Sequence, residues 1–134
     1  MEAAQRDYAG GSKRVYVLAN MGLYESRQLV NLFGAVRQWC AIMGFEYCGG
    51  TGVSAGELVG VLSRHLPFNV GFTRNVARGM RKLARAIDGG AAAGEILAEL
   101  FCFPRRLYIR IANGGWKRMA RANGIRAEDL YRRL

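Results

Sequence analysis

The sequence predicts an α/β fold, in which two strands and their flanking helices form part of a doubly wound parallel sheet and a helical extension follows. The main observation is a repeated order of elements. A short run of apolar and β-branched residues is followed by a turn and then by apolar residues at the 3 and 4 spacing of a helix face, twice before Pro67. Such alternation is typical of parallel strands connected by helices. The second observation is size, because 134 residues, 51% of them hydrophobic, suffice for one domain.

Residues 14–20 form the first predicted strand. Val15 to Ala19 is almost wholly apolar, as a strand covered on both faces should be. A helix is expected next, with Ser26 as its N-cap and Gly44 as its C-cap. Its apolar face consists of Leu29, Leu32, Phe33, Val36, Trp39, Cys40 and Met43.

Residues 45–49 form the second predicted strand, and a glycine-rich loop over 49–56 leads into a helix with apolar positions Leu58, Val59, Val61 and Leu62. These are the two convincing strands, and a parallel sheet of two strands is not expected to be stable alone. Three explanations stay open. The remaining strands lie on sequence upstream of Met1, they belong to a second chain, or the helices pack into a small α+β domain.

The residues after Pro67 are expected to be helical. A basic amphipathic helix with apolar positions from Val76 to Ile87 ends at Gly89-Gly90, and Ile96, Leu97 and Leu100 predict a short helix. After Pro104 a further helix is expected to be interrupted at Gly114-Gly115 and to end at Asn123-Gly124. The predicted organisation is a polar segment over 1–13, a partial α/β unit over 14–103 and a helical extension over 104–134.

The charge of the chain is concentrated in its second half. The net charge is +10, and residues 68–134 hold 14 basic and 5 acidic side chains, so this half carries +9. Such a field favours anionic partners and agrees equally with a solvated basic face. Nucleic acid is therefore the alternative ligand, bound through Arg74, Arg78, Arg81, Lys82 and Arg85 on one helix and Arg105, Arg106, Arg110, Lys117, Arg118 and Arg121 on the next.

Other function classes are disfavoured. The three cysteines share no metal-ligand spacing with each other or with His65, the single histidine, so no metal site is expected. Ser54 or Cys48 would need a base to act as a nucleophile, and His65 lies at the far end of the following helix. No signal peptide or membrane span is predicted, so a cytoplasmic protein without a membrane partner is expected. No catalytic residue can be assigned.

Two loops are candidate binding sites. The first follows the first strand, where open α/β sheets bind ligands. There Gly22 would admit a flat ligand, Tyr24 could stack on it and Asn20 could hydrogen-bond to it; an ordinary turn is the alternative. The second loop carries a G-x-G-x-x-x-G run before a helix, which suits either a phosphate or tight helix packing. The predicted site residues are Asn20, Met21, Gly22, Leu23, Tyr24, Glu25, Gly50, Thr51 and Gly52.

Several segments in order resemble the C-terminal half of flavodoxin-like NAD(P)H-dependent FMN reductases. Residues 15–25 with the Trp39 helix are similar to that family's fourth strand, loop and helix, and residues 44–57 to its fifth strand and glycine loop. Residues 75–84 are similar to the helix after it, and 104–118 with 123–132 to its C-terminal extension. The resemblance implies a partial flavodoxin-like sheet, an FMN ring resting on the 20–25 loop with help from 50–52, and NAD(P)H as the reductant.

The chain departs from that family in lacking counterparts of its first strand, its phosphate loop and its third-strand loop. The sequence therefore predicts a flavoprotein fragment with half of the cofactor site. The uncovered strand edge next to residues 14–20 would be an apolar surface, so a homo-oligomer or a complementing chain is also expected.

Overall fold

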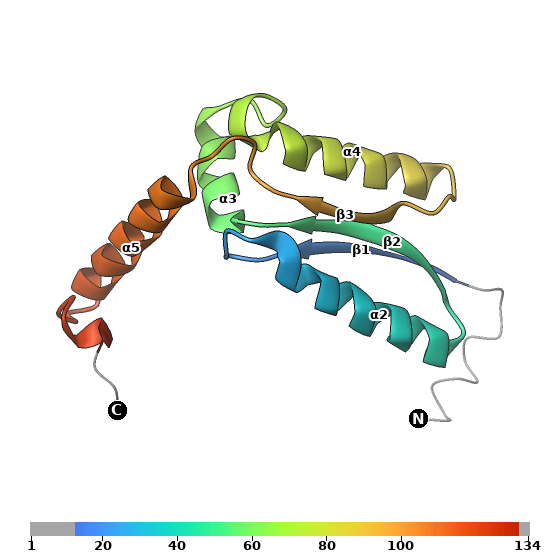
Figure 1. The fold of residues 1–134 in the computed structure, drawn as a ribbon, viewed down its shortest axis with the longest axis horizontal. Coiled ribbons are helices and arrows are strands. Elements are labelled where there is room, and N and C mark those ends of the chain that lie inside the picture. Colours follow the sequence, from blue (N-terminus) through green and yellow to red (C-terminus); the bar gives the residue numbers. More distant parts are fainter. Residues whose placement is uncertain (1–12, 132–134) are drawn as a thin grey trace. The chain divides into compact units, whose positions relative to one another are not determined.

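The computed structural model describes residues 13–131, so most of the predicted polar segment lies outside the described residues. The chain forms two compact units, divided between Phe101 and Cys102. The first unit contains, in order, β1 (Arg14–Asn20), α2 (Leu29–Met43), β2 (Glu46–Val53), α3 (Gly56–His65), α4 (Arg74–Asp88) and β3 (Gly94–Ala98) (Figure 1). The second contains α5 (Arg105–Ala122) and a 3₁₀ turn (Asp129–Tyr131). The α/β class is confirmed.

The three strands form one parallel sheet in the order β1-β2-β3. β1 pairs with β2 from Arg14 opposite Glu46 to Asn20 opposite Val53, with an irregularity between Val15 and Val17. The prediction of two strands is wrong, because β3 pairs along β2 from Gly94 opposite Gly49 to Ala98 opposite Val53. Among the described residues, the outer edge of β1 has no strand beside it.

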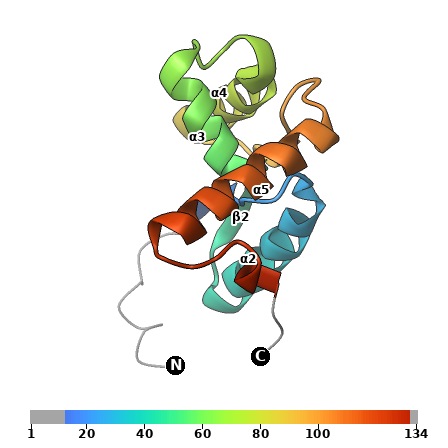
Figure 2. The same ribbon diagram turned by 90° about the vertical axis from the view of Figure 1, so that its left-hand side faces the viewer.

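Helices α2 and α4 cover opposite faces of this sheet (Figures 1 and 2). On β2, the α carbon of Gly52 faces Leu29 and Phe33 of α2. The neighbouring Thr51 points the other way and donates its hydroxyl to the carbonyl of Gly79 on α4, at 3.1 Å. The chain moves from β1 to β2 and then from β2 to β3, in the same direction across the sheet both times. The first connection contains α2 on one face, and the second contains α4 on the other. The two crossovers therefore have opposite hands, whereas connections of this kind are nearly always right-handed.

Each face has its own small core. Under α2, Phe33 is fully buried and clusters with Ala19 and Leu29. Under α4, Leu83 and Ala86 cluster with Ala93, and Tyr16 packs against them. Burial of a side chain of the size of Phe33 contributes about 1.5–3 kcal/mol. The two clusters hold the helices against the sheet and so fix the positions of the strand ends.

The predicted glycine loop over 49–56 is, for most of its length, the strand β2. A side chain at Gly50 would collide with the backbone of Val17 on β1, and one at Gly49 would collide with the backbone of Gly94 on β3. One at Gly52 would lie 2.8 Å from a methyl carbon of Leu29. The glycines therefore allow close packing around the central strand, and they do not form a turn.

The predicted short helix at Ile96, Leu97 and Leu100 is wrong, because residues 94–98 form β3. Ile96 faces α4, where its Cγ2 lies 3.5 Å from the position of a Cβ on Gly79. A run of five residues is too short for its own periodicity to decide between helix and strand. Pairing with β2 makes this segment a strand.

Two predicted helix boundaries also differ from the structure. Ser26 is not the N-cap of α2 but the first residue of a 3₁₀ turn (Ser26–Gln28), and its hydroxyl donates to Glu99. Gly44 does end α2, with the left-handed φ of 70° that the prediction requires. In the second unit, α5 runs through Gly114-Gly115 without interruption. Helix interiors tolerate glycine at about 1 kcal/mol per residue, so this pair weakens α5 without ending it.

Candidate functional site

The loop over 21–25 lies where β1 and β2 both end, at the carboxyl edge of the parallel sheet. Three backbone hydrogen bonds anchor it there. The amide of Met21 donates to the carbonyl of Val53 at 3.0 Å, that of Ala55 to Leu23 at 2.7 Å, and that of Gly56 to Met21 at 2.9 Å. The loop is therefore fixed against both the end of β2 and the start of α3.

This loop presents a mixed surface to solvent. Asn20, Gly22, Leu23 and Glu25 are exposed, and Leu23 keeps 51% of its surface accessible. The φ of Gly22 lies outside the left-handed region, and a Cβ placed there would meet no atom within 4 Å. Neither the backbone nor packing thus requires glycine at this position, and its effect is to leave the main chain bare next to an exposed apolar side chain.

Asn20 is positioned by the start of α3. Its side-chain amide occupies the space that a side chain on Gly56 would fill. Gly56 therefore allows the amide to lie against the amino end of this helix. Ala55, directly before it, adopts a left-handed φ of 52° and is buried. Strain at a buried non-glycine residue persists only where the surroundings impose it, so the junction of β2 and α3 is tightly determined.

The structure separates the predicted site residues into two groups. Asn20, Met21, Gly22, Leu23, Tyr24 and Glu25 lie together at the carboxyl edge, with Met21 and Tyr24 partly buried. Gly50, Thr51 and Gly52 lie inside β2 and are buried. These three residues shape the sheet below the loop, and they offer no exposed surface to a ligand.

A contact between two residues at this edge, Ser26 and Glu99, was not predicted. The hydroxyl of Ser26 donates to Oε1 of Glu99 at 2.7 Å, and its backbone amide donates to the same oxygen at 3.2 Å. Glu99 follows β3, so this contact joins the first loop to the third strand. The nearby Ser54 is fully buried, and its Oγ has no hydrogen-bond partner among the described residues. The contact to Glu99 was not expected, because Ile96, Leu97 and Leu100 predicted a short helix in this segment.

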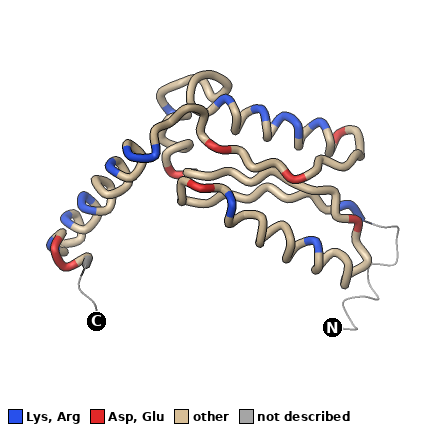
Figure 3. The backbone as a smooth tube through the Cα atoms, in the orientation of Figure 1, with Lys and Arg blue, Asp and Glu red and all other residues tan. Residues whose placement is uncertain are grey.

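A second candidate surface is the basic face of α4. Arg74, Arg78, Arg81, Lys82 and Arg85 are all exposed, and Lys and Arg follow this helix along its length (Figure 3). The Arg74 guanidinium carbon lies 3.2 Å from the ring centroid of Phe101. Arg78 and Lys82 border an open pocket of about 330 Å³ between α4 and β3. Its lining consists of Asn75, Arg78, Gly79, Lys82, Ile96, Leu97 and Ala98. The surface combines cations with an apolar floor.

A third cluster lies near the other end of the sheet, in an open pocket of about 350 Å³. The hydroxyl of Tyr47 donates to Oε1 of Glu95 at 3.0 Å, and Arg37 pairs with the same carboxylate. Burial, followed by the hydrogen bond to Glu95, raises the pKa of Tyr47 to about 12. This cluster connects α2 to β3, and its charges are already paired with each other.

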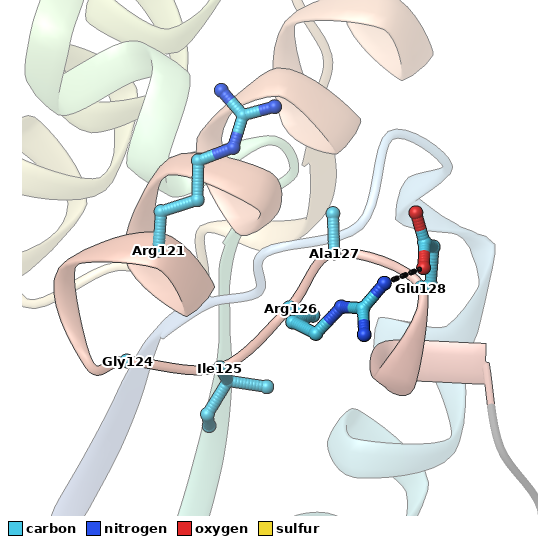
Figure 4. Close-up of a pocket in the computed structure, with 6 residues that line it drawn as sticks. All are labelled: Arg121, Gly124, Ile125, Arg126, Ala127 and Glu128. Atoms are coloured by element: carbon cyan, nitrogen blue, oxygen red, sulfur yellow. Dashed lines mark hydrogen bonds and ion pairs between the residues drawn. The ribbon is translucent and has the colours of Figure 1, made fainter.

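The second unit has an open pocket of about 410 Å³ formed by the chain after α5. Figure 4 shows Arg126 turned toward Glu128, and the two form an ion pair at 2.9 Å. The pairing neutralises one of the two arginines that line the pocket, the other being Arg121. An anion is therefore less favoured here than on the face of α4.

Neither metal-binding side chains, nor membrane-spanning helices, nor similarity to known proteins point to a function for the described residues. No group of three His, Cys, Asp or Glu side chains that could hold a metal ion occurs within residues 13–131. None of the helices described has the length and apolar content that crossing a membrane requires. Comparison of the chain with known protein families, curated proteins and solved structures gave no match.

Proposed function

We propose that the loop over 21–25 is the ring-facing part of an FMN site, in a chain that is a part of a flavodoxin-like, NAD(P)H-dependent flavin reductase. The bare main chain at Gly22 carries this proposal, because a flat isoalloxazine ring needs backbone and apolar surface without a protruding side chain. Leu23 supplies the apolar surface. The resemblance to the reductases supports the same loop.

The anchoring of the loop also supports the proposal. A ring binds best to a surface that is already ordered, because less conformational entropy is lost on binding. The hydrogen bonds to Val53, Ala55 and Gly56 order this loop in advance. Its place at the carboxyl ends of parallel strands is where open α/β sheets bind ligands.

Among the residues that the structure describes, this edge offers no site for the phosphate end of FMN. Glu25 is exposed on the loop, Glu57 lies in the first turn of α3, and Glu99 bonds to Ser26. Three carboxylates at this edge disfavour a phosphate. The proposed role is therefore limited to the ring, and hydride transfer from NAD(P)H requires a phosphate-binding part that residues 13–131 do not form.

The test is a titration of the chain with FMN, followed by flavin fluorescence and visible absorbance. Gly22→Val places a side chain over the bare backbone, and Leu23→Glu removes the apolar surface. Each is expected to weaken binding at least tenfold. Val70→Glu is the matched control, because Val70 is exposed to a similar degree, 48% against 51%, and lies between α3 and α4. A folded chain that never perturbs FMN, or equal weakening by the control, would refute the proposal.

Nucleic-acid binding through α4 is the second candidate function. The observation that favours it is the row of five exposed cations beside the pocket over Ile96 and Leu97. Cations on one helix face can follow a phosphate backbone, and an apolar floor can receive a base.

Fluorescence anisotropy with labelled single-stranded RNA and DNA, at low and physiological salt, tests this function. Arg78→Gln and Lys82→Gln are each expected to weaken binding uniformly across sequences and to reduce the salt slope by about 1. Arg64→Gln, at the end of α3, is the control. Absence of binding at low salt would discard this function, because phosphate contacts are strongest there.

A further inference from the structure

From its second residue onward, α5 carries its charges on one half of its circumference. The helix contains six Lys and Arg residues and no Asp or Glu. After Arg105, the 3.6-residue period places all of them on the same side of the helix. Lys and Arg follow α5 along its length (Figure 3). The exposed cations of this half are Arg106, Arg110, Lys117, Arg118 and Arg121.

The other half of α5 is apolar and largely exposed. Beyond Arg105 it carries aliphatic and aromatic side chains without a charge, over about half of the circumference by the helical period. Trp116 keeps 58% of its surface accessible, Met119 48% and Ile111 46%. The large side chains of this half are Tyr108, Ile109, Ile111, Trp116 and Met119.

The two basic helices of the chain differ in what covers their apolar faces. In α4, the apolar residues Val76, Ala77, Leu83 and Ala86 are buried in the packing of that helix on the sheet. In α5, all of which the structure describes, only Ala120 is buried. Both helices combine cations with an apolar face, and that of α5 remains open to a partner.

We propose that α5 lies in the surface of a membrane that contains anionic phospholipids. Its apolar half would enter the boundary between headgroups and acyl chains, and the long Lys and Arg side chains would reach the phosphates at that level. Trp116 and Tyr108 suit this depth, because each joins an apolar ring to a polar N–H or O–H. Such a helix need not span the bilayer. The proposal therefore revises the expectation of no membrane partner, which rested on the lack of a spanning segment.

The charge and the apolar area together favour a lipid surface. A nucleic acid would pair with the cations and leave the apolar half in water. A second copy of the chain would cover the apolar half but would bring further cations without anions. A protein groove binds a helix through anchors at i, i+3, i+4 and i+7, whereas the apolar side chains of α5 are spread around half of the helix. An anionic lipid surface is complementary to both halves at once.

Flotation of the full chain with lipid vesicles tests the proposal. The chain is expected to bind vesicles of phosphatidylcholine and phosphatidylserine at least tenfold more tightly than vesicles of phosphatidylcholine alone, and high salt should weaken this binding. Ile111→Glu places a charge in the apolar half and is expected to weaken binding at least tenfold. Ile87→Glu on α4 is the matched control, because Ile87 is exposed to a similar degree, 49% against 46%.

A second set of variants tests the cationic half. Arg110→Gln and Lys117→Gln are each expected to weaken binding to the anionic vesicles about fivefold. Neither residue lines the pocket that follows α5. Arg78→Gln and Lys82→Gln on α4 are the matched controls, and they should leave vesicle binding nearly unchanged. Equal weakening by the α4 variants would show that net charge alone attracts the chain, and it would overturn the proposal.

Tryptophan fluorescence reports directly on α5, because Trp116 and Trp39 are the two tryptophans of the chain. In a Trp39→Phe chain, the anionic vesicles are expected to shift the emission of Trp116 to shorter wavelength and to protect it from an aqueous quencher. In a Trp116→Phe chain, the emission of Trp39 on α2 should stay unchanged.

Three results would overturn the proposal. They are a folded chain that does not float with anionic vesicles, even if it binds RNA; an equal shift of Trp39; and a shift of Trp116 that depends on protein concentration without lipid. The proposal does not depend on the flavin site. FMN binding by a chain that binds no vesicles would retain that site and reject the membrane surface.

Discussion

Replacing Gly50 by alanine should destabilise the chain, because the strands β1 and β2 approach each other where a side chain would lie. The new Cβ would be 2.7 Å from Cβ and 2.9 Å from the carbonyl carbon of Val17, and closer still to its oxygen. Carbon atoms in contact prefer 3.5–4.0 Å, so the two backbones must separate. Overpacking costs about 1–3 kcal/mol, and backbone contact places this site at the upper end. Alanine also lowers the conformational entropy of the unfolded chain relative to glycine, which stabilises the folded state by about 0.4–1 kcal/mol. The net loss in the free energy of unfolding is therefore about 2 kcal/mol.

The assay is urea unfolding, monitored by circular dichroism and tryptophan fluorescence. Gly60→Ala is the matched control, because it makes the same chemical change inside α3, where a Cβ meets nothing within 4 Å. This control should stabilise the chain by about 0.5–1 kcal/mol. The two variants should therefore shift the midpoint in opposite directions. A Gly50→Ala chain at least as stable as the unsubstituted chain would show that β2 is not packed as described.

Three further changes test the packing around the site. Phe33→Ala should lower the free energy of unfolding by about 3–5 kcal/mol, because this ring is fully buried under α2, and a much smaller loss in urea unfolding would contradict that burial. Ser54→Ala should raise the free energy of unfolding by about 1 kcal/mol, because it removes a buried hydroxyl without a partner; a clear loss would indicate a bond to that oxygen. Tyr47 has a pKa raised from 10.0 to about 12, so the neutral phenol stabilises the folded state. That contribution is complete below pH 10 and is lost as the pH rises toward 12. Unfolding across this range should therefore show a loss of stability that Tyr47→Phe reduces, and an equal loss in both chains would rule out this cause.

The sequence predicted the elements whose signal is local and long. The α4 helix and its end at Gly89-Gly90 follow from fifteen residues of helical periodicity, and the strand over 14–20 follows from an apolar run bounded by polar residues. β3 could not be predicted in this way, because its five residues owe their conformation to pairing with β2. Most of the predicted glycine loop is part of a strand for the same reason. Gly50 packs against Val17, thirty-three residues earlier in the chain, so closely that a side chain at position 50 would collide with it.

The predicted site residues divide in the same way, into those with a local sequence signal and those whose position depends on contacts with distant residues. The loop over 20–25 was predicted from its place after a strand, and the structure brings its six residues together at the sheet edge. Gly50, Thr51 and Gly52 were assigned from a glycine pattern that binding loops and closely packed strands share. The bond from Ser26 to Glu99 spans seventy-three residues, and no local pattern announces a contact of that length.

The glycine content of β2 has a consequence for how the sheet assembles. The central strand contacts both neighbouring strands and both covering helices, yet Glu46 to Val53 includes three glycines, which have little intrinsic preference for extended structure. β2 therefore cannot serve as a local nucleus, and it gains its conformation only as α2, α4 and the flanking strands close around it. Folding of the first unit should accordingly be cooperative. The amides of β2 would then exchange through global unfolding, while those at the ends of α2 and α4 exchange through local opening.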